Sequence, residues 1–474
     1  MAPSALPEFR AMLSIDLGSG SLLRRRTLLH VGSSAAAILS ASGLPWLKAA
    51  SILDPQRLKD RSVIFLFMHG GPSQYETFDP KMEAPSHIRS ATGAIATKIP
   101  GIYFGSTFHQ LAQRADLFST VRSFVPGDAN HDIKPIVSSA SFRCSLGSIY
   151  SRVAGAVRPE TAIPTAALLH PRSVQPEAGP MITEFGNLAS SGELGAQYAP
   201  FIPGAGAGLQ EDMQLHLPLE RLADRRSLLE QLDRQRRRIE STSASETETL
   251  RAQAFDALVK EVSQAFDLRR ESAETIARFD TGPLVRPEQI RTQWNNHKHY
   301  ADHAANLGKL LLLARRLCEQ GCGFVTVTTS FVWDMHADVN NAPMQEGMRY
   351  VGAPFDHAVS ALIDDLQERG LSEKIMLVCC GEMGRTPSLN AAGGRDHWGN
   401  LGPLMIYGGG TRGGQVIGQS SHDGGQPASD PIRIPDLMAT LYDQLLDVNA
   451  VRLDTSLPRQ VLDLLGSGKP IAGL

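Results

Sequence analysis

Apolar runs alternate with amphipathic segments along most of the sequence. Five segments have the length and composition of buried strands, and the first, Val63–Met68, is continuously apolar. Strands covered on both faces read in this way in parallel sheets. We expect strands within residues 63–68, 115–124, 324–329, 373–382 and 403–410.

Helical segments separate these runs. Residues 306–320 and 353–370 precede the third and fourth predicted strands, and residues 436–446 form a closing helix. The second of these helices ends at Gly370, a natural C-terminal cap position. This alternation predicts an α/β fold, a three-layer sandwich in which helices cover both faces of a mostly parallel central sheet.

One region departs from the alternation. Residues 205–290 are strongly charged and helical in periodicity, with a Ser/Thr-rich turn between the helical parts. They can form a helical lid over a site, or a helical hairpin whose charged side chains face solvent. The hairpin is favoured because runs of charge usually form solvated faces. Either way, we predict that 205–290 is a helical insertion in a domain that spans residues 51–470.

The N-terminal segment has the pattern of an export signal. Three arginines, Arg24–Arg26, precede a weakly apolar Ala/Ser/Leu run, and the Arg-Arg-Thr-Leu-Leu sequence resembles a twin-arginine signal. A membrane anchor is the alternative, but Gly43 and Pro45 leave the run shorter than the roughly 20 apolar residues of a span. We therefore assign residues 1–50 to an export signal and leader. This predicts a periplasmic or secreted protein with no stable membrane span once the signal is removed.

Charge and cysteine content exclude several classes of protein. The net charge is −3 over 474 residues, so no excess of Lys and Arg points to a nucleic-acid partner. The five cysteines contain no Cys-x-x-Cys pair, which argues against a zinc ribbon or a disulfide framework.

Clusters of histidine and acidic residues follow four of the predicted strands. In a mostly parallel sheet, ligands gather at the carboxyl ends of the strands. Combined in one cavity, imidazole and carboxylate groups would suit zinc or manganese, although each cluster alone is also compatible with a surface turn. The clusters contain His69 and Glu76 after the first strand, Asn130 and His131 after the second, Asp334 and His336 after the third, and Glu382, Arg385, Asp396 and His397 after the fourth.

The glycine-rich segment after the fourth strand admits two interpretations. In the functional one, Glu382 binds a metal, Arg385 holds an anionic oxygen with two hydrogen bonds, and Asp396 orients His397. In the structural one, Arg385 and Asp396 form a buried ion pair that closes the loop.

Four stretches resemble the exported, sulfatase-like family called "domain of unknown function 1501". They are "GGPSQYETFDPK", "FVWDMHAD", "LIDDLQERGLSEKIMLVCCGEMGRTP" and "GGRDHWGN", and the resemblance covers about residues 24–465. The family is placed among relatives of alkaline phosphatases and sulfatases, which implies an alkaline-phosphatase-like sandwich with a divalent metal (zinc, manganese or calcium) at the strand ends. The resemblance places five residues around one or more metal ions: Asp334, His336, Glu382, Asp396 and His397.

The chain departs from the family pattern in two regions. The family usually has His and Asp where this chain has Gln74 and Glu76, so Glu76 keeps the charge of a ligand on a longer side chain. The nucleophile of phosphatases and sulfatases would fall on Asn130-His131, at the start of a helix, and neither residue has a hydroxyl group. His131 is then a metal ligand or a general base, or else Asn130 caps a helix beside a structural histidine.

These observations lead to two hypotheses of function. The first is an exported, metal-dependent hydrolase of phosphate or sulfate esters, including saccharide esters, in which His131, Asn130 and Arg385 are the candidate catalytic residues. The second is a non-catalytic protein of the cell envelope that keeps the fold and a structural metal and binds a polysaccharide or another partner.

Overall fold

The computed structural model describes residues 57–204 and 262–474. The predicted export signal and residues 205–261 of the predicted insertion lie outside the described residues. Within the described ranges, no helix is both long enough and apolar enough to cross a membrane.

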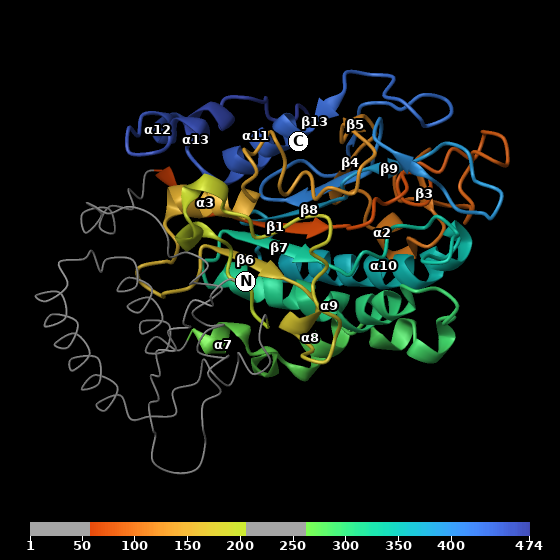
Figure 1. Ribbon diagram of the computed structural model, residues 1–474, viewed down its shortest axis with the longest axis horizontal. Helices are drawn as coiled ribbons and strands as arrows, with labels where there is room; N and C mark the ends of the chain where they lie inside the picture. Colours follow the sequence, from red (N-terminus) through yellow and green to blue (C-terminus); the bar gives the residue numbers. More distant parts are fainter. Residues whose placement is uncertain (1–56, 205–261) are drawn as a thin grey trace, which may run out of the picture.

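A seven-stranded sheet forms the centre of the fold, in the order β12-β4-β11-β8-β1-β7-β6 (Figure 1). β1 lies between β7 and β8 and is parallel to both, so the first, third and fourth predicted strands are neighbours. β11 runs antiparallel to both β8 and β4. The strands are β1 (Ser62–Phe67), β4 (Phe118–Val121), β6 (Ala166–Leu169), β7 (Phe324–Thr328), β8 (Ile375–Cys380), β11 (Leu404–Gly408) and β12 (Val416–Ile417).

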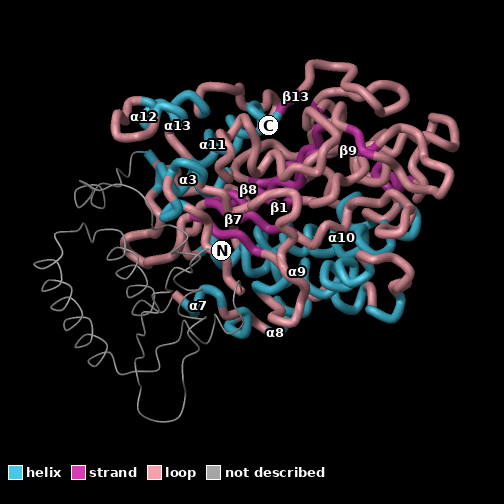
Figure 2. Tube along the Cα trace, in the orientation of Figure 1, coloured by secondary structure: helices cyan, strands magenta, loops and turns pink. Residues whose placement is uncertain are grey.

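Helices cover both faces of this sheet (Figures 1 and 2). Long helices α9 (His297–Glu319) and α10 (Met344–Glu368) lie on one face, and α3 (Leu146–Ala154) and α11 (Ile434–Leu445) lie on the other. Successive side chains of β1 divide between the two cores, because neighbouring residues of a strand point to opposite faces. The predicted three-layer α/β sandwich with a mostly parallel sheet is confirmed.

Shorter elements complete the described chain. The remaining strands are β2 (Ala94–Ala96), β3 (Tyr103–Gly105), β5 (Phe124–Val125), β9 (Gly384–Arg385), β10 (His397–Trp398) and β13 (Ile432–Arg433). The remaining α-helices are α2 (His109–Ala112), α7 (Ser263–Phe266), α8 (Ala273–Arg278), α12 (Val448–Arg452) and α13 (Arg459–Leu464). Six 3₁₀ turns are η3 (Pro171–Ser173), η4 (Gly192–Leu194), η5 (Ala196–Tyr198), η6 (Leu268–Arg270), η7 (Gly282–Leu284) and η8 (Pro287–Gln289).

Helix α10 starts nine residues earlier than the sequence pattern suggested and continues through Pro354. Its apolar face extends upstream through the buried Met344, Met348 and Val351, which keeps this part of the helix on the core. The predicted end is correct, since Gly370 adopts a φ of 66° just after the helix.

The described part of the predicted insertion, residues 262–290, consists of short helical turns packed against α9. The sequence predicted that its charged side chains face solvent, but this is not true of all of them. Arg315 of α9 is fully buried and pairs with Glu271 at 2.8 Å and with Asp365 at 3.0 Å. These carboxylates compensate a guanidinium that would otherwise be costly to bury.

A buried histidine between α9 and α10 should make the fold sensitive to acid. His303 is 1% exposed, its Nε2 donates to the Val351 carbonyl at 3.1 Å, and burial lowers its pKa from 6.5 to about 4. Below about pH 6.5 the unfolded chain therefore binds a proton that the folded chain refuses. The free energy of unfolding should fall as the pH drops from 6.5 towards 4, with about 3 kcal/mol of that loss from His303.

Denaturant titrations at several pH values measure this effect. His303→Gln keeps a donor for Val351 but cannot take up the proton, so its stability should depend less on pH in this range. His87→Gln, at an exposed histidine, is the control. Identical pH profiles for His303→Gln and the unmodified chain would contradict the assignment.

Candidate metal centre

Metal-binding side chains gather where three neighbouring parallel strands end. Asp334 and His336 follow β7, Glu382 follows β8, and His69 follows β1. Because the three strands run side by side in the same direction, their carboxyl ends meet at one edge of the sheet. The sequence prediction that these segments converge is therefore confirmed.

Two further histidines reach this edge from longer connections. His397 lies in β10, which pairs antiparallel with β9, and His397 stands opposite Arg385 in that two-stranded ribbon. His131 lies in the loop that follows β5. No helix starts at His131, so the expected position at a helix N-terminus is wrong.

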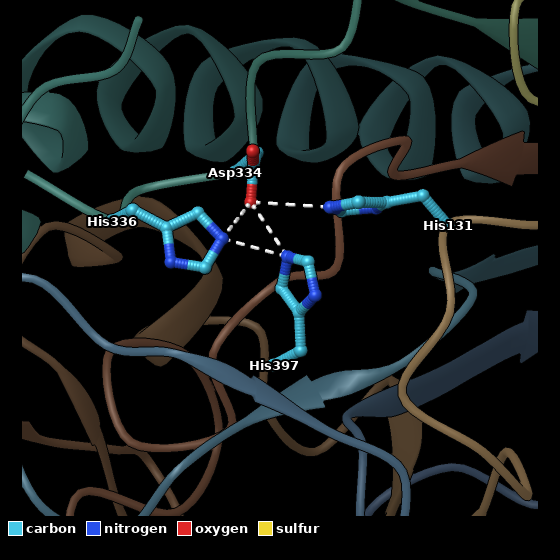
Figure 3. Close-up of side chains that lie close together, drawn as sticks. All are labelled: His131, Asp334, His336 and His397. Atoms are coloured by element: carbon cyan, nitrogen blue, oxygen red, sulfur yellow. Dashed lines mark hydrogen bonds and ion pairs between the residues drawn. The ribbon is translucent and has the colours of Figure 1, made fainter. Parts of the chain in front are cut away.

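Four side chains form the centre: His131, Asp334, His336 and His397 (Figure 3). One ligand atom from each lies within 4.8 Å of the others. Asp334 Oδ1 is at the middle, 2.9 Å from His336 Nε2 and 3.4 Å from the Nε2 atoms of His131 and His397. The two nitrogens of His336 and His397 are 2.6 Å apart.

Asp334 stays ionised although it is only 6% exposed. Burial raises the pKa of its carboxyl group, but Arg385 and the three imidazoles outweigh burial and hold the pKa well below its usual range. Arg385 Nη2 donates to Oδ1 at 2.7 Å, and Asn341 Nδ2 donates to Oδ2 at 3.0 Å.

Glu382 orients His131. This carboxylate is fully buried, and its Oε1 accepts from His131 Nδ1 at 2.9 Å and from the Gly70 amide at 2.9 Å. Burial lowers the pKa of His131, whereas its bonds to Asp334 and Glu382 raise it, and the net shift is upward. In the neutral ring, the Nδ1–H group of His131 donates to Glu382. The lone pair of Nε2 then points to the centre.

The donor set fits a divalent cation. Three carboxylates, Asp334, Glu382 and Asp396, stand against one guanidinium, Arg385, which leaves an excess of two negative charges around the imidazoles. The Nε2 atoms of His336 and His397 are 2.6 Å apart, so at most one of them carries a proton in this short contact. A cation held by both nitrogens would satisfy both lone pairs.

Arg385 does not have the predicted role of an anion clamp. Its guanidinium is fully buried and donates to the backbone carbonyls of Gly70, Gly71 and Arg395 as well as to Asp334. These bonds occupy the donors that a substrate oxygen would need. The alternative ion pair with Asp396 is also wrong, because Asp334 is the partner.

Glu76 is not a member of the four-residue centre. It is fully buried against Arg395, with 3.1 Å between Glu76 Oε1 and Arg395 Nη2, and it also accepts from Ser73 Oγ and the Ala91 amide. Arg395 was not predicted as a site residue. This segment contains two arginines, Arg385 and Arg395, and the sequence does not indicate which of them contacts a carboxylate. Glu76 acts here as a structural ion-pair partner.

The remaining predicted residues lie around the centre. Asp396 is largely exposed, and its Oδ1 lies 3.3 Å from His336 Nδ1, so it is placed to orient His336 and not His397 as predicted. His69 is buried beside Phe331, its Nε2 has no hydrogen-bond partner, and burial lowers its pKa to about 4. Its role as a ligand stays a prediction. Asn130 is exposed, and its contacts in the structure are backbone bonds to Asp128 and Lys134.

Removal of a ligand should remove the metal. We expect the purified chain to bind zinc or manganese, and Asp334→Ala, His336→Ala and His397→Ala each to weaken binding more than about hundredfold, beyond the effect of losing an orienting partner. Asp396→Asn should weaken it by about tenfold. Mass spectrometry of bound metal and calorimetric titration measure these effects.

The control for these variants is His422→Ala, at an exposed histidine outside the centre. It should bind metal like the unmodified chain. Equal metal binding in His422→Ala and all three ligand variants would contradict the site.

Several solved structures are similar to this chain at low sequence identity. Among solved structures, the chain is similar to the PsFucS1 sulfatase from Pseudoalteromonas sp., with 13% identity, 95% of this chain and 78% of that chain covered, and a TM-score of 0.35. It is also similar to the phosphonate monoester hydrolase SpPMH from Silicibacter pomeroyi, with 12% identity, coverage of 81% and 73%, and a TM-score of 0.32. A third similar structure is Ps i-CgsB in complex with k-i-k-neocarrahexaose, with 10% identity, coverage of 87% and 77%, and a TM-score of 0.31.

No curated protein matches the chain. The sequence matches the family described as "Protein of unknown function (DUF1501)" over residues 60–457, which is most of its length. The chain therefore belongs to the DUF1501 family.

Proposed function

We propose that this protein is a metal-dependent hydrolase of phosphate or sulfate esters. The observation that carries the proposal is the convergence of His131, Asp334, His336 and His397 around one carboxylate oxygen. These side chains come from three connections far apart in the sequence, and the carboxylates around them outnumber the guanidinium of Arg385 by two. The membership of the chain in a family that resembles sulfatases supports the same reaction class.

Asp334, His336 and His397 are the proposed ligands of a single divalent cation. A set of nitrogen donors and one carboxylate suits zinc or manganese better than calcium, which prefers oxygen ligands. A cation in such a site supplies Lewis-acid polarisation of an ester oxygen and lowers the pKa of a water molecule.

His131 is the proposed proton carrier. Glu382 holds its Nδ1, and its Nε2 faces the centre, so the ring can take a proton from an attacking water and release it later. Water is the proposed nucleophile. The position at which a side-chain nucleophile was expected holds Asn130-His131, and neither residue has a hydroxyl group. Arg385 contributes by fixing the ionised Asp334.

An aromatic wall beside His131 supports a saccharide ester as substrate. Phe185 and Phe331 stack with 4.6 Å between ring centroids, and their centroids lie 5.2 and 4.7 Å from that of His131. Phe331 is buried and Phe185 is half-buried. Phe185 is the more exposed ring of this pair and is the one placed to contact a sugar ring, while a few polar groups fix the orientation of the ligand.

Activity should separate the ligands from the proton carrier. His131→Asn keeps a donor for Glu382 but removes the Nε2 atom, so it should retain the metal and lose about 10²–10⁴-fold in turnover. Asp334→Ala should lose both metal and turnover. Hydrolysis of aryl phosphates, aryl sulfates and sulfated saccharides, with bound metal measured in parallel, tests this.

The same experiment tests the binding-protein alternative, which the absence of a hydroxyl nucleophile at Asn130-His131 favours. If the metal-loaded chain hydrolyses no ester, or if His131→Asn keeps full turnover, the proposed mechanism is wrong. Loss of the metal in His131→Asn would make His131 a ligand instead.

We also propose that the protein is exported through its N-terminal arginines, which lie outside the described residues. Replacement of Arg25 and Arg26 by lysine should block delivery across the membrane, because the twin-arginine pattern requires this pair. Cell fractionation measures the delivered share. Unchanged delivery of the lysine variant would contradict a twin-arginine route.

A further inference from the structure

An open cavity of about 760 Å³ is bounded on one side by the glycine-rich loop that follows β9 and precedes His397. Three parts of the chain line it: residues 82–93, the first turns of α10, and residues 389–393 of the loop. A side chain at Gly93 would meet no atom within 4 Å, which reflects the open space there. The volume is typical of pockets that bind small ligands.

The cavity carries unbalanced positive charge. Arg89 and Arg349 are exposed, and neither guanidinium has an ion-pair partner among residues 57–204 and 262–474. The acidic residue in the lining, Glu346, accepts from Tyr350 Oη at 2.6 Å and lies 3.2 Å from Arg291. The two free guanidinium groups therefore remain available to an anion.

Neutral donors accompany these arginines. Ser90 Oγ and Thr92 Oγ1, both in lining residues, are 3.1 Å apart and share a hydrogen bond. A guanidinium binds sulfate, phosphate or carboxylate oxygens through two parallel N–H groups, and hydroxyl groups suit sugar oxygens. The lining thus matches an acidic sugar unit.

One buried arginine ties the cavity wall to the metal centre. Arg395 Nη2 donates to the carbonyls of Ile88 at 2.8 Å and Arg89 at 3.0 Å. The next two residues of the loop are Asp396 and His397, so the backbone of Arg89 is held by the loop that carries the centre. Glu76 strengthens this link, because its Oε1 accepts from Ala91 at 2.9 Å.

The opposite wall has a similar tether. The Met344 amide at the start of α10 donates to the Gly393 carbonyl at 3.0 Å, and Asn390 Nδ2 donates to the His336 carbonyl at 2.8 Å. The loop residues 389–393 therefore contact α10 and the cavity while Asn390 contacts the backbone of a proposed ligand. Both walls are fixed relative to the centre.

We propose that this cavity is a second anion-binding subsite, which holds a sulfate, phosphate or carboxylate group on one unit of an anionic oligosaccharide while another unit presents its ester to the metal centre. The inference rests on the proposed function and narrows its substrate to saccharides that carry more than one anionic group. A single small ester would bind at the metal centre without using Arg89 and Arg349.

The test compares two double variants of the full, metal-loaded chain. Arg89→Ala/Arg349→Ala removes both guanidinium groups from the cavity, and Arg270→Ala/Arg412→Ala removes two exposed arginines from elsewhere on the surface. Calorimetry measures binding of a heparin-derived oligosaccharide, with a neutral oligosaccharide and a single-stranded oligonucleotide as comparison ligands. Hydrolysis of a small aryl sulfate or phosphate is measured in parallel.

We expect the cavity variant to bind the anionic oligosaccharide at least about tenfold more weakly, since bonds to charged groups are lost. Arg89→Lys/Arg349→Lys should lie between the two, because lysine keeps the charge without the bidentate geometry. The control variant should bind normally, and all variants should hydrolyse the small ester equally.

Equal binding by the cavity and control variants would overturn the subsite, and so would arginine-dependent binding of the oligonucleotide as tight as that of the oligosaccharide. The experiment distinguishes failure of the proposed function from failure of the proposed subsite. Arginine-dependent binding of the oligosaccharide without any ester hydrolysis would refute the proposed function but support the subsite. Hydrolysis of the small ester, together with oligosaccharide binding that is equal in the cavity and control variants, would do the reverse.

Discussion

The ion pair between Asp334 and Arg385 is the interaction on which the rest of the centre depends. Asp334 is buried, and a carboxyl group in that position would take up a proton without a compensating positive charge. Arg385, at 2.7 Å, keeps it ionised, and the three imidazoles converge on the ionised oxygen. Loss of this charge would remove the anion around which the histidines are arranged.

The backbone is built around this pair. Arg385 is held by carbonyl groups of Gly70 and Gly71, which lie in the turn directly after β1. Gly70 has a φ of 110°, and a Cβ atom there would lie 2.6 Å from the Asp334 amide. Gly70 therefore allows the segments that follow β1 and β7 to approach closely. A side chain at this position would push Asp334 away.

Much of this fold and part of the centre could be predicted from the sequence. Continuous apolar runs identified β1, β7 and β8, and polar residues directly after them identified Asp334, His336 and Glu382. The partners were not predictable, because ion pairs between residues 51 and 319 positions apart depend on the tertiary structure. Arg385 and Arg395 each follow a glycine in the same segment, yet one holds Asp334 and the other holds Glu76. The antiparallel direction of β11 likewise depends on the connections between strands, and its apolar pattern is the same in either direction.

The central claim is that Asp334, His336 and His397 hold one divalent cation. Anomalous diffraction from crystals grown with zinc or manganese tests it most directly. We expect one strong anomalous peak at about 2.0–2.2 Å from Asp334 Oδ1 and from the Nε2 atoms of His336 and His397. No peak among these atoms, with the side chains still joined by direct hydrogen bonds, would contradict it.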